Sequence, residues 1–317
     1  MGSPLRLQVA APADEGAAVV EGAWQAVVDE FEAVEQALSR FRPSSEIHRL
    51  RLAGGHADRP SRRLVAALVA ADRARRVTGG RFDPRVLTDL ERLGSAPIDL
   101  PATAASLAWP GSARPDPMAP LLRRVGRSGP IEVPLPVDFG GIGKGLALRW
   151  AARRAARVLG ALPFLLDAGG DIVANGCPAD HGWRIGVEDP RPALGGEAQG
   201  SDESPAVVIE LPRDGAAVAT SSIRRARWTS PDGGAVHHLI DPRTGAPGGE
   251  GLLAVTVVGR DPAWAEVWAK SLFLVGRGGI AALARARGLA AWWVTVDGQV
   301  EMTPAARPLT IWVAGEG

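Results

Sequence analysis

The chain has 317 residues, with 36 lysines and arginines against 35 aspartates and glutamates, and 46% of its residues are hydrophobic. This is the composition of a globular protein, and a formal charge of +1 provides no broad basic surface for nucleic acid. The single cysteine, Cys177, excludes an internal disulfide and a cysteine-built zinc site. Residues 1–13 lack the apolar segment of a secretory signal, and no apolar run approaches the ~20 residues of a membrane span. We therefore expect a cytoplasmic protein, unless a leader has been removed.

The first half of the chain is predicted to contain one strand and two helices before a long irregular segment. Residues 5–10 alternate as in a short strand, and residues 17–41 carry an apolar stripe at helical spacing that stops at Pro43. A second helix, over 61–77, ends at Thr78-Gly79-Gly80, a glycine signal for a helix C-terminus. Residues 95–130 are rich in proline, alanine, serine and glycine without a sustained period, so we interpret them as an irregular insertion.

The second half mixes short strands with two further helices. Because the strands and helices interleave without a regular βα alternation, we predict an α+β fold with mixed sheets rather than a doubly wound one. The length suits one domain over residues 1–317, or two closely packed lobes. Helices are predicted over 146–159 and 263–275, a hairpin over 289–302, and strands over 131–139, 164–166, 183–188, 206–211, 216–220 and 252–258.

The most informative segment is Asp138-Phe139-Gly140-Gly141-Ile142-Gly143-Lys144-Gly145, which leads into a predicted helix. Glycines let a backbone approach a ligand closely, a helix N-terminus presents unpaired N–H groups, and Lys144 adds a positive charge, so the segment suits a diphosphate. It matches neither a Walker A loop, which has Ser or Thr after the lysine, nor the G-x-G-x-x-G dinucleotide fingerprint. The chain has only two lysines, Lys144 and Lys270, which favours a function for this segment over a plain glycine-rich turn.

A second segment, His237-His238-Leu239-Ile240-Asp241-Pro242-Arg243-Thr244-Gly245, offers acid–base chemistry. Adjacent side chains of a strand point to opposite faces, so we expect only one of the two histidines in a site. A histidine followed three residues later by Asp241 can act as a general base with an orienting carboxylate. The Asp-Pro-Arg-Thr-Gly sequence is also typical of an ordinary turn.

Two further clusters are weaker. Thr220-Ser221-Ser222 with Arg224, Arg225 and Arg227 suits a phosphate, although a turn before a solvated basic strand explains the same residues. Glu266 and Lys270 lie four residues apart on one predicted helix, where an exposed ion pair is the ordinary interpretation.

In their order along the chain, these segments resemble the ApbE family of FAD:protein FMN transferases. The resemblance runs from Met1-Gly2-Ser3 to about Met302, through seven matching segments at 39–46, 80–84, 138–145, 167–171, 217–221, 237–245 and 265–276. It implies an ApbE-like, T-fold-like architecture. It also implies an enzyme that takes FAD, uses Mg²⁺, links FMN through its phosphate to a Thr or Ser of an acceptor flavoprotein, and releases AMP.

The resemblance also implies the residues of the site. The catalytic histidine of the family matches His238, which would take the proton of the acceptor hydroxyl, while His237 is structural. Phe41 would supply an aromatic face, and Lys144 a charge for the diphosphate. The flavin contacts of the family match Met1, Phe41, Arg81, Phe82, Asp83, Asp138, Lys144 and Ile240, the last through its backbone.

This chain departs from the family pattern at the metal position. The family holds Mg²⁺ by a loop carbonyl, which matches Gly141, and by an Asp and a Thr or Asp four residues apart on the late helix, which match Glu266 and Lys270. A glutamate can still bind the metal, but a protonated lysine cannot. We therefore expect the Lys270 ammonium near the position of the cation, paired with Glu266 and beside the Gly141 carbonyl.

Two alternatives to the transferase stay open at this point. A pyrophosphatase would release FMN and AMP from FAD, with water in place of the acceptor. A flavin-binding protein without catalysis is favoured by the altered metal position. AMP release separates an enzyme from a binding protein, and flavin on an acceptor separates the two enzymes.

Overall fold

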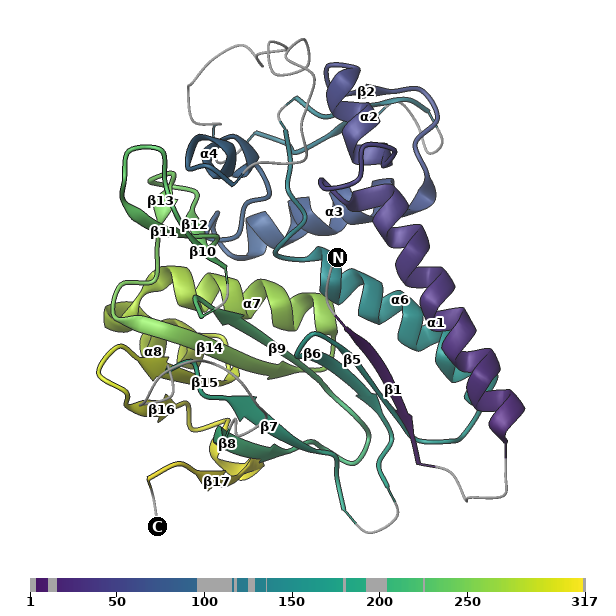
Figure 1. Cartoon of the computed structure of the whole chain (residues 1–317), viewed down its shortest axis with the longest axis vertical. Helices are drawn as coiled ribbons and strands as arrows, with labels where there is room; N and C mark the ends of the chain where they lie inside the picture. The colour runs from purple at the N-terminus through teal and green to yellow at the C-terminus, as the bar shows by residue number, and fades with distance from the viewer. Residues whose placement is uncertain are drawn as a thin grey trace.

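The computed structural model describes residues 4–10, 16–95, 116, 119–124, 129–134, 136–178, 181–191, 204–224 and 226–315. At its centre lies a seven-stranded sheet with the order β1-β5-β6-β9-β14-β15-β16 (Figure 1). Strands from the two ends of the chain therefore form the two edges of one sheet. The strands are β1 (Leu5–Val9), β5 (Phe164–Ala168), β6 (Asp171–Asn175), β9 (Ala217–Ser222), β14 (Leu252–Gly259), β15 (Ala290–Thr295) and β16 (Val300–Met302).

The α+β class is confirmed, but the prediction of mixed sheets is wrong, because every strand pair in the described ranges is antiparallel. The connections explain this arrangement. A tight turn at Gly169 and Gly170, both with positive φ, joins β5 to β6. Two helices, rather than one, join β14 to β15. A single helix returns the chain parallel to the strand that it leaves, whereas a second helix reverses the direction again.

Long helices cover one face of the large sheet. α6 (Gly143–Leu159) packs on β5 and β6, and α7 (Pro262–Val275) packs on β9 and β14 (Figure 1). α1 (Ala17–Leu38) lies against α6, and α8 (Arg277–Ala286) follows α7. The apolar stripes of these helices are buried, as the sequence predicted for α1 and α6. α6 starts three residues earlier than predicted, so Gly143 and Lys144 belong to its first turn.

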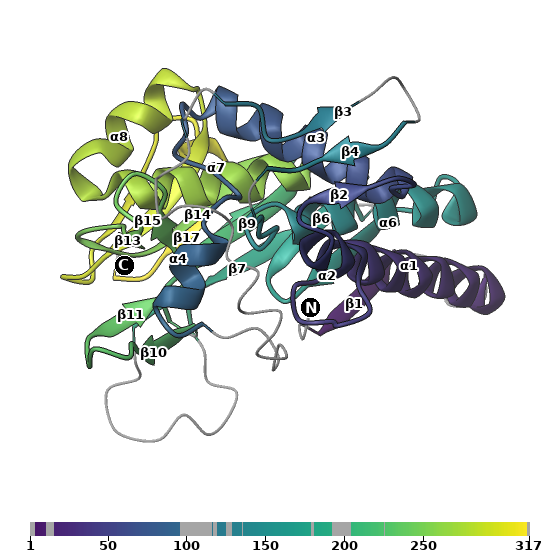
Figure 2. The same cartoon turned by 90° about the horizontal axis from the view of Figure 1, so that it is seen from above.

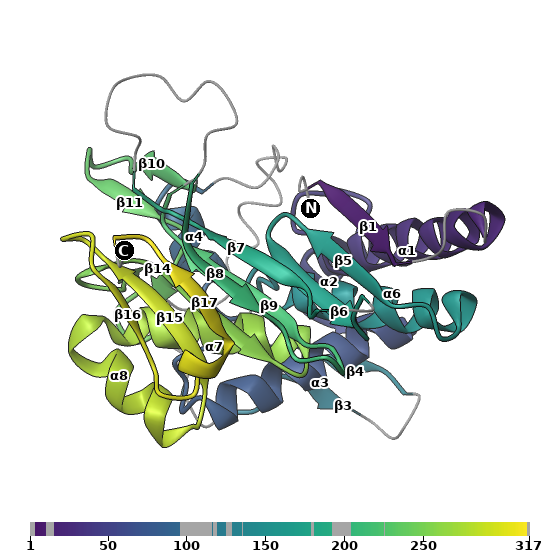
Figure 3. The ribbon, with the colours of Figure 1, turned by 90° about the horizontal axis from the view of Figure 1, so that it is seen from below.

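A small three-stranded sheet covers the opposite face, as seen from below in Figure 3. Its apolar side chains, among them Ile185 and Ile209, are buried together with Ile172, Val218 and Trp292 of the large sheet. The short helix η1 (Arg307–Leu309) leads into its last strand. The strands are β7 (Arg184–Glu188), β8 (Pro205–Glu210) and β17 (Thr310–Val313).

Smaller elements gather at the end of the molecule beyond α7 (Figure 2). α3 passes over α7, where the Arg73 guanidinium lies 5.5 Å from the Trp264 ring. α4 is tied to the short hairpins, because Trp228 donates to the Leu93 carbonyl at 2.6 Å. These elements are α2 (Glu46–Leu52), α3 (Arg62–Val77), α4 (Leu87–Arg92), β2 (His56–Ala57), β3 (Arg123–Arg124), β4 (Ile131–Glu132), β10 (Arg227–Thr229), β11 (Ala235–His237), β12 (Ile240–Asp241) and β13 (Ala246–Pro247).

The prediction of a strand over 131–139 is wrong beyond its first two residues. Among the described residues of this range only β4 forms, because Pro134 and Pro136 have no N–H to donate to a neighbouring strand. Most of the predicted insertion at 95–130 lies outside the described residues, and β3 is its one described strand. In the part of the chain that the structure describes, no helix combines the length and apolarity of a membrane span.

Candidate functional site

The Asp138–Gly145 segment turns into the N-terminus of α6 and meets α7 there. Its residues 143–145 form the first turn of α6, where backbone N–H groups have no partner within the helix. Glu266 of α7 accepts the N–H of Gly145 at 2.7 Å. A Cβ on Gly145 would lie 2.5 Å from both the Cα of Ala263 and the carbonyl oxygen of Pro262, so only glycine lets the two helices approach this closely.

Lys144 is held at this turn by a buried carboxylate. Its ammonium contacts Asp171 at the start of β6, and the other oxygen of Asp171 accepts the N–H of Thr220 at 3.1 Å. Burial alone disfavours the charge, but the carboxylates of Asp171 and Glu266 outweigh it and raise the pKa of Lys144. Asp171 was part of a matching segment, yet sequence reasoning gave it no role. Two such segments, 138–145 and 167–171, thus meet through this ion pair.

Lys270 lies on the other side of the same loop. A Cβ on Gly141 would lie 2.6 Å from Lys270 Nζ and 2.8 Å from its Cδ and Cε, so the end of the lysine side chain packs against this glycine. Lys270 therefore lies against Gly141, while its expected place at a cation position beside the Gly141 carbonyl stays a prediction. Burial lowers the pKa of Lys270, and the carboxylates of Asp138 and Glu266 oppose that shift.

The two interpretations of Glu266 as an ion-pair partner of Lys270 are both wrong. Glu266 is only 6% exposed, which excludes a surface pair, and no ion pair joins it to Lys270 in the described residues. Its Oε2 is used by Gly145, while its Oε1 is buried without a hydrogen-bond partner. Burial raises the pKa of Glu266 well above the ordinary value. The carboxylate thus serves the junction of α6 and α7.

His238 shares this site with both lysines. Burial is the main cause that lowers its pKa to about 3, and the nearby charge of Lys270, with that of Lys144, acts in the same direction. Its Nδ1 is buried and has no hydrogen-bond partner among the described residues. The residue is partly exposed.

His237 has different surroundings. Its ring meets the edge of Phe273 at a centroid distance of 6.0 Å, and its Nδ1 accepts the N–H of Leu239 at 3.3 Å. Burial, followed by the charge of Arg227, lowers its pKa to about 4. These contacts are those of a structural histidine.

The structure does not bring Asp241 to His238. Asp241 accepts from the backbone N–H of Arg243 at 2.9 Å and from its guanidinium at 2.6 Å, and no hydrogen bond joins it to His238 in the described residues. Asp241 therefore does not orient His238 as expected. Its carboxylate closes the local turn of the Asp-Pro-Arg sequence instead. Ile240 pairs with Pro247 through the β12–β13 ladder, and its side chain is buried against α4.

Arg40 and Phe41 lie at the Asp138 end of the 138–145 loop, which we call the rim of the site. The Arg40 guanidinium is 3.3 Å from the Asp138 carboxylate and 4.3 Å from the centroid of the Phe41 ring, which is 51% exposed. An exposed aromatic ring beside an arginine suits stacking of a planar ligand. Sequence reasoning singled out Phe41 and Asp138 and missed Arg40, although Arg40 stands within the first matching segment.

Pro84, which follows the Arg81-Phe82-Asp83 stretch, contacts the loop through its backbone. Asp138 donates its N–H to the Pro84 carbonyl at 2.7 Å. Phe82 is 2% exposed, and both oxygens of Asp83 bind Arg85, so these two side chains stabilise the stretch itself. Burial lowers the pKa of Arg81, and the nearby charge of Arg243 acts in the same direction.

The remaining candidates do not converge on the site. Arg224 binds Glu188, and Arg227 donates to the Ile223 carbonyl at 2.5 Å. These two side chains of the expected phosphate cluster therefore bind other residues of the chain. Met1 and Arg225 lie outside the described residues. Thr220 contributes differently, through its N–H to Asp171.

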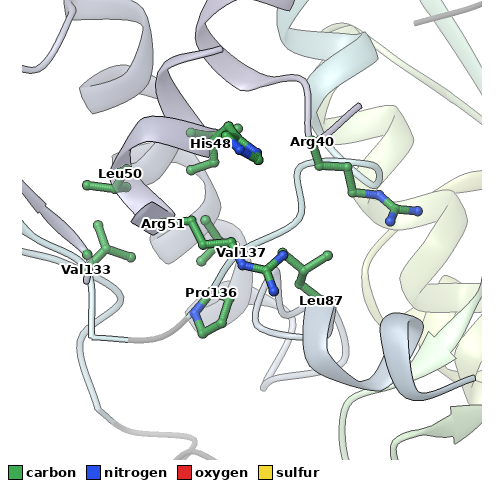
Figure 4. Close-up of a pocket in the computed structure, with 10 residues that line it drawn as sticks. Arg40, His48, Leu50, Arg51, Leu87, Val133, Pro136 and Val137 are labelled. Carbon is green, nitrogen blue, oxygen red and sulfur yellow. The ribbon is translucent and has the colours of Figure 1, made fainter. Parts of the chain in front are cut away.

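A small apolar pocket lies behind Arg40. Its walls come from α2, α4 and the 133–137 segment, and the Arg40 side chain extends away from it (Figure 4). Its volume is about 20 Å³, which holds about one water molecule and no flavin ring. This pocket is therefore not the candidate site, which we define by the residues gathered at the 138–145 loop.

The residues at the implied metal position do not fit Mg²⁺. The Lys270 ammonium fills the space beside Gly141, and a positive group repels a second cation. Of the side-chain oxygens there, one Glu266 oxygen is committed to Gly145. The described residues contain no group of three or more His, Cys, Asp or Glu side chains that could hold a metal ion.

Comparison with known proteins shows which family the chain belongs to. A family model described as the ApbE family matches residues 1–293. The chain belongs to the ApbE family. An FAD:protein FMN transferase of Klebsiella pneumoniae is 27% identical over 184 residues, which are 57% of this chain and 48% of that protein. The protein of the same name from Escherichia coli is 28% identical over 166 residues, 51% and 43% of the two chains. The matched segments thus span about half the length of these relatives.

Solved ApbE structures share the fold of this chain along nearly its whole length. The ApbE protein of Thermotoga maritima superposes with a TM-score of 0.78 at 22% identity, covering 97% of this chain and 96% of that chain. The flavin transferase ApbE from Vibrio cholerae superposes with a TM-score of 0.74 at 22% identity, covering 98% and 96%. The ApbE-like architecture expected from the sequence is confirmed.

Proposed function

We propose that this chain is an FAD:protein FMN transferase, the activity for which its ApbE relatives are named. The observation that supports this most is that His238, Lys144 and Lys270 come together at one glycine-rich loop on a helix N-terminus. Positive side chains and the positive end of a helix dipole favour a diphosphate. A histidine beside them can move the proton of a nucleophile.

In this proposal, FAD is the substrate and an acceptor flavoprotein is the partner. The hydroxyl oxygen of the acceptor Thr or Ser forms a bond to the FMN phosphorus. The bond from that phosphorus to the bridging oxygen breaks, and AMP leaves with this oxygen. His238 takes the hydroxyl proton, while Lys144 and Lys270 face the charge on the phosphate oxygens.

The pKa of His238 fits a base that becomes stronger when the substrate is bound. Without a ligand, burial and the lysine charges hold its pKa at about 3. A bound diphosphate offsets the lysine charges, which raises the pKa of His238 toward the range in which a general base is effective.

The rim residues would bind the rest of FAD. Phe41 offers an exposed ring, stacked with Arg40, to a planar group of the flavin nucleotide. Arg81, Asp138 and the backbone of Ile240 stay our predicted FAD contacts, with Met1, Phe82 and Asp83 as the other positions that match the family.

Chromatography of the reaction mixture tests the proposal. The chain is incubated with FAD, with and without an acceptor flavoprotein encoded beside it, and AMP, free FMN and protein-bound flavin are measured. We expect AMP only in equal amount with flavin on the acceptor. AMP with free FMN would instead indicate a pyrophosphatase, and bound FAD without AMP would indicate a binding protein. A catalytically dead control is His238→Ala.

A further inference from the structure

The two lysines of the chain differ in their partners. Lys144 contacts the Asp171 carboxylate, so its charge is balanced within the protein. Lys270 makes neither an ion pair nor a hydrogen bond with any residue in the described ranges, although it lies at the same loop. Of the two lysines, Lys270 is therefore the one whose amine has no partner in the described residues and can bind a ligand.

The end of the Lys270 side chain lies directly against the loop. Its Nζ, Cε and Cδ pack against Gly141, two residues before the first residue of α6. Asp138 is the carboxylate that acts most strongly on the charge of Lys270, and it is already paired with Arg40 at 3.3 Å. The remaining carboxylate, Glu266, directs one oxygen to the Gly145 N–H and makes no ion pair with Lys270 in the described residues. Neither carboxylate thus fully balances the Lys270 ammonium.

The choice of lysine is also specific. Of the 36 cationic side chains, two are lysines, so arginine is the ordinary cation of this chain. An ammonium is compact, whereas a guanidinium is a wide planar group. With Nζ only 2.6 Å from the position of a Cβ on Gly141, the space suits the compact group.

We infer that the Lys270 ammonium replaces a divalent cation in this chain, so that the diphosphate of FAD binds at the 138–145 loop without Mg²⁺. This inference rests on the proposed function, because it takes FAD as the ligand of the loop. A diphosphate next to Lys270 also stabilises the charged form of its amine and so reinforces the contact. A fixed ammonium attracts the diphosphate as a metal ion does, and no metal ion has to bind first.

Titration of the full chain with FAD, followed by flavin fluorescence, tests the inference in Mg²⁺ and in chelator. For the wild type we expect the same Kd, within about twofold, in both. For Lys270→Thr we expect the affinity in chelator to fall about 10-fold or more, since a charged partner is lost, and to recover in part with Mg²⁺. The matched control is Arg157→Ala, which removes an exposed positive charge at the far end of α6 and should leave both Kd values unchanged.

A second variant moves the ammonium without removing it. In Gly141→Ala, the new Cβ displaces the flexible end of Lys270, so FAD affinity in chelator should fall while the melting temperature changes little. Direct metal binding is read from the electron paramagnetic resonance of Mn²⁺ without FAD. The wild type should leave Mn²⁺ free, and the double variant Glu266→Asp with Lys270→Thr should bind it.

The outcomes separate the inference from the proposed function. FAD binding to the wild type that weakens 10-fold or more in chelator overturns the inference and leaves the transferase proposal standing. So does a folded Lys270→Thr variant that binds FAD in chelator as tightly as the wild type. Failure of the wild type to bind FAD in either buffer overturns the proposed function itself, and the inference with it.

Discussion

Glu266 and Gly145 are 121 residues apart in the chain, and the carboxylate of the first accepts the N–H of the second at 2.7 Å. This hydrogen bond ties α7 to the first turn of α6. It also uses one of the N–H groups that a helix N-terminus would otherwise offer to an anion. The junction therefore sets the position of the loop and the number of donors left at the site.

Substitutions at Glu266 should show what the hydrogen bond contributes to stability. Glu266→Gln keeps an oxygen acceptor for the Gly145 N–H, whereas Glu266→Ala leaves that buried donor without a partner. We expect Glu266→Ala to lower the free energy of unfolding by about 1–3 kcal/mol, and Glu266→Gln by less. Urea denaturation measures both. Equal stability of the alanine variant and the wild type would show that the hydrogen bond is unimportant.

Gly145→Ala should separate the two helices. The new Cβ would lie 2.5 Å from backbone atoms of Ala263 and Pro262, which cannot move independently of α7. Overpacking of this kind costs about 1–3 kcal/mol, and FAD affinity should fall with it. The control is Gly278→Ala in α8, where no atom lies within 4 Å of the added Cβ and alanine suits a helix. A stable Gly145→Ala variant with unchanged FAD affinity would contradict the close approach.

The acid side of the pH–rate profile should lie below the ordinary histidine range. Because the folded pKa of His238 is lowered to about 3, the neutral base form persists as the pH falls, and activity is lost only toward that value. We expect kcat/KM, which reports the free enzyme, to change little between pH 7 and pH 5. In Lys270→Thr, loss of one cause of the lowered pKa should move the acid limb upward. An acid limb near pH 6.5 in the wild type would rule out this environment.

The two histidines should respond differently to substitution. His238→Ala should reduce transfer by about 10²- to 10⁴-fold and leave FAD affinity nearly unchanged, since general-base help acts on the rate. His237→Ala should affect transfer less, and mainly lower the melting temperature, because its ring packs on Phe273. Single-turnover kinetics and FAD titration separate these effects. The reverse ranking would mean that the assignment of the two rings is wrong.

Local patterns predicted much of the fold, and long-range contacts account for the rest. The apolar stripes of α1, α3, α6 and α7 have a clear helical period, so these helices were found from the sequence. The helices α2, α4 and α8 and the two-residue strands other than β4 were not predicted. α2, α4 and these strands contain too few residues to show a period. The antiparallel order of the sheet depends on how distant segments pair, which no local pattern contains.

The site shows the same division. Lys144 and Lys270 stood out as the only lysines, whereas His238 and Gly141 were singled out by the family resemblance. Lys270 lies against Gly141, and the charges of both lysines act on His238. The partners that decide their charge were not foreseen: Asp171 balances Lys144, and Arg40 binds Asp138. Asp241 was misjudged, because sequence proximity to His238 says nothing about where its carboxylate points, and the nearby Arg243 binds it.

Intact-mass spectrometry of the acceptor flavoprotein, after incubation with this chain and FAD, tests FMN transfer most directly. We expect the acceptor to gain the mass of FMN less one water, at a single Thr or Ser, with one AMP released per modified chain. The modification should also form in chelator with the wild type and fail with His238→Ala. An acceptor of unchanged mass, while the wild type binds FAD, would contradict the transferase.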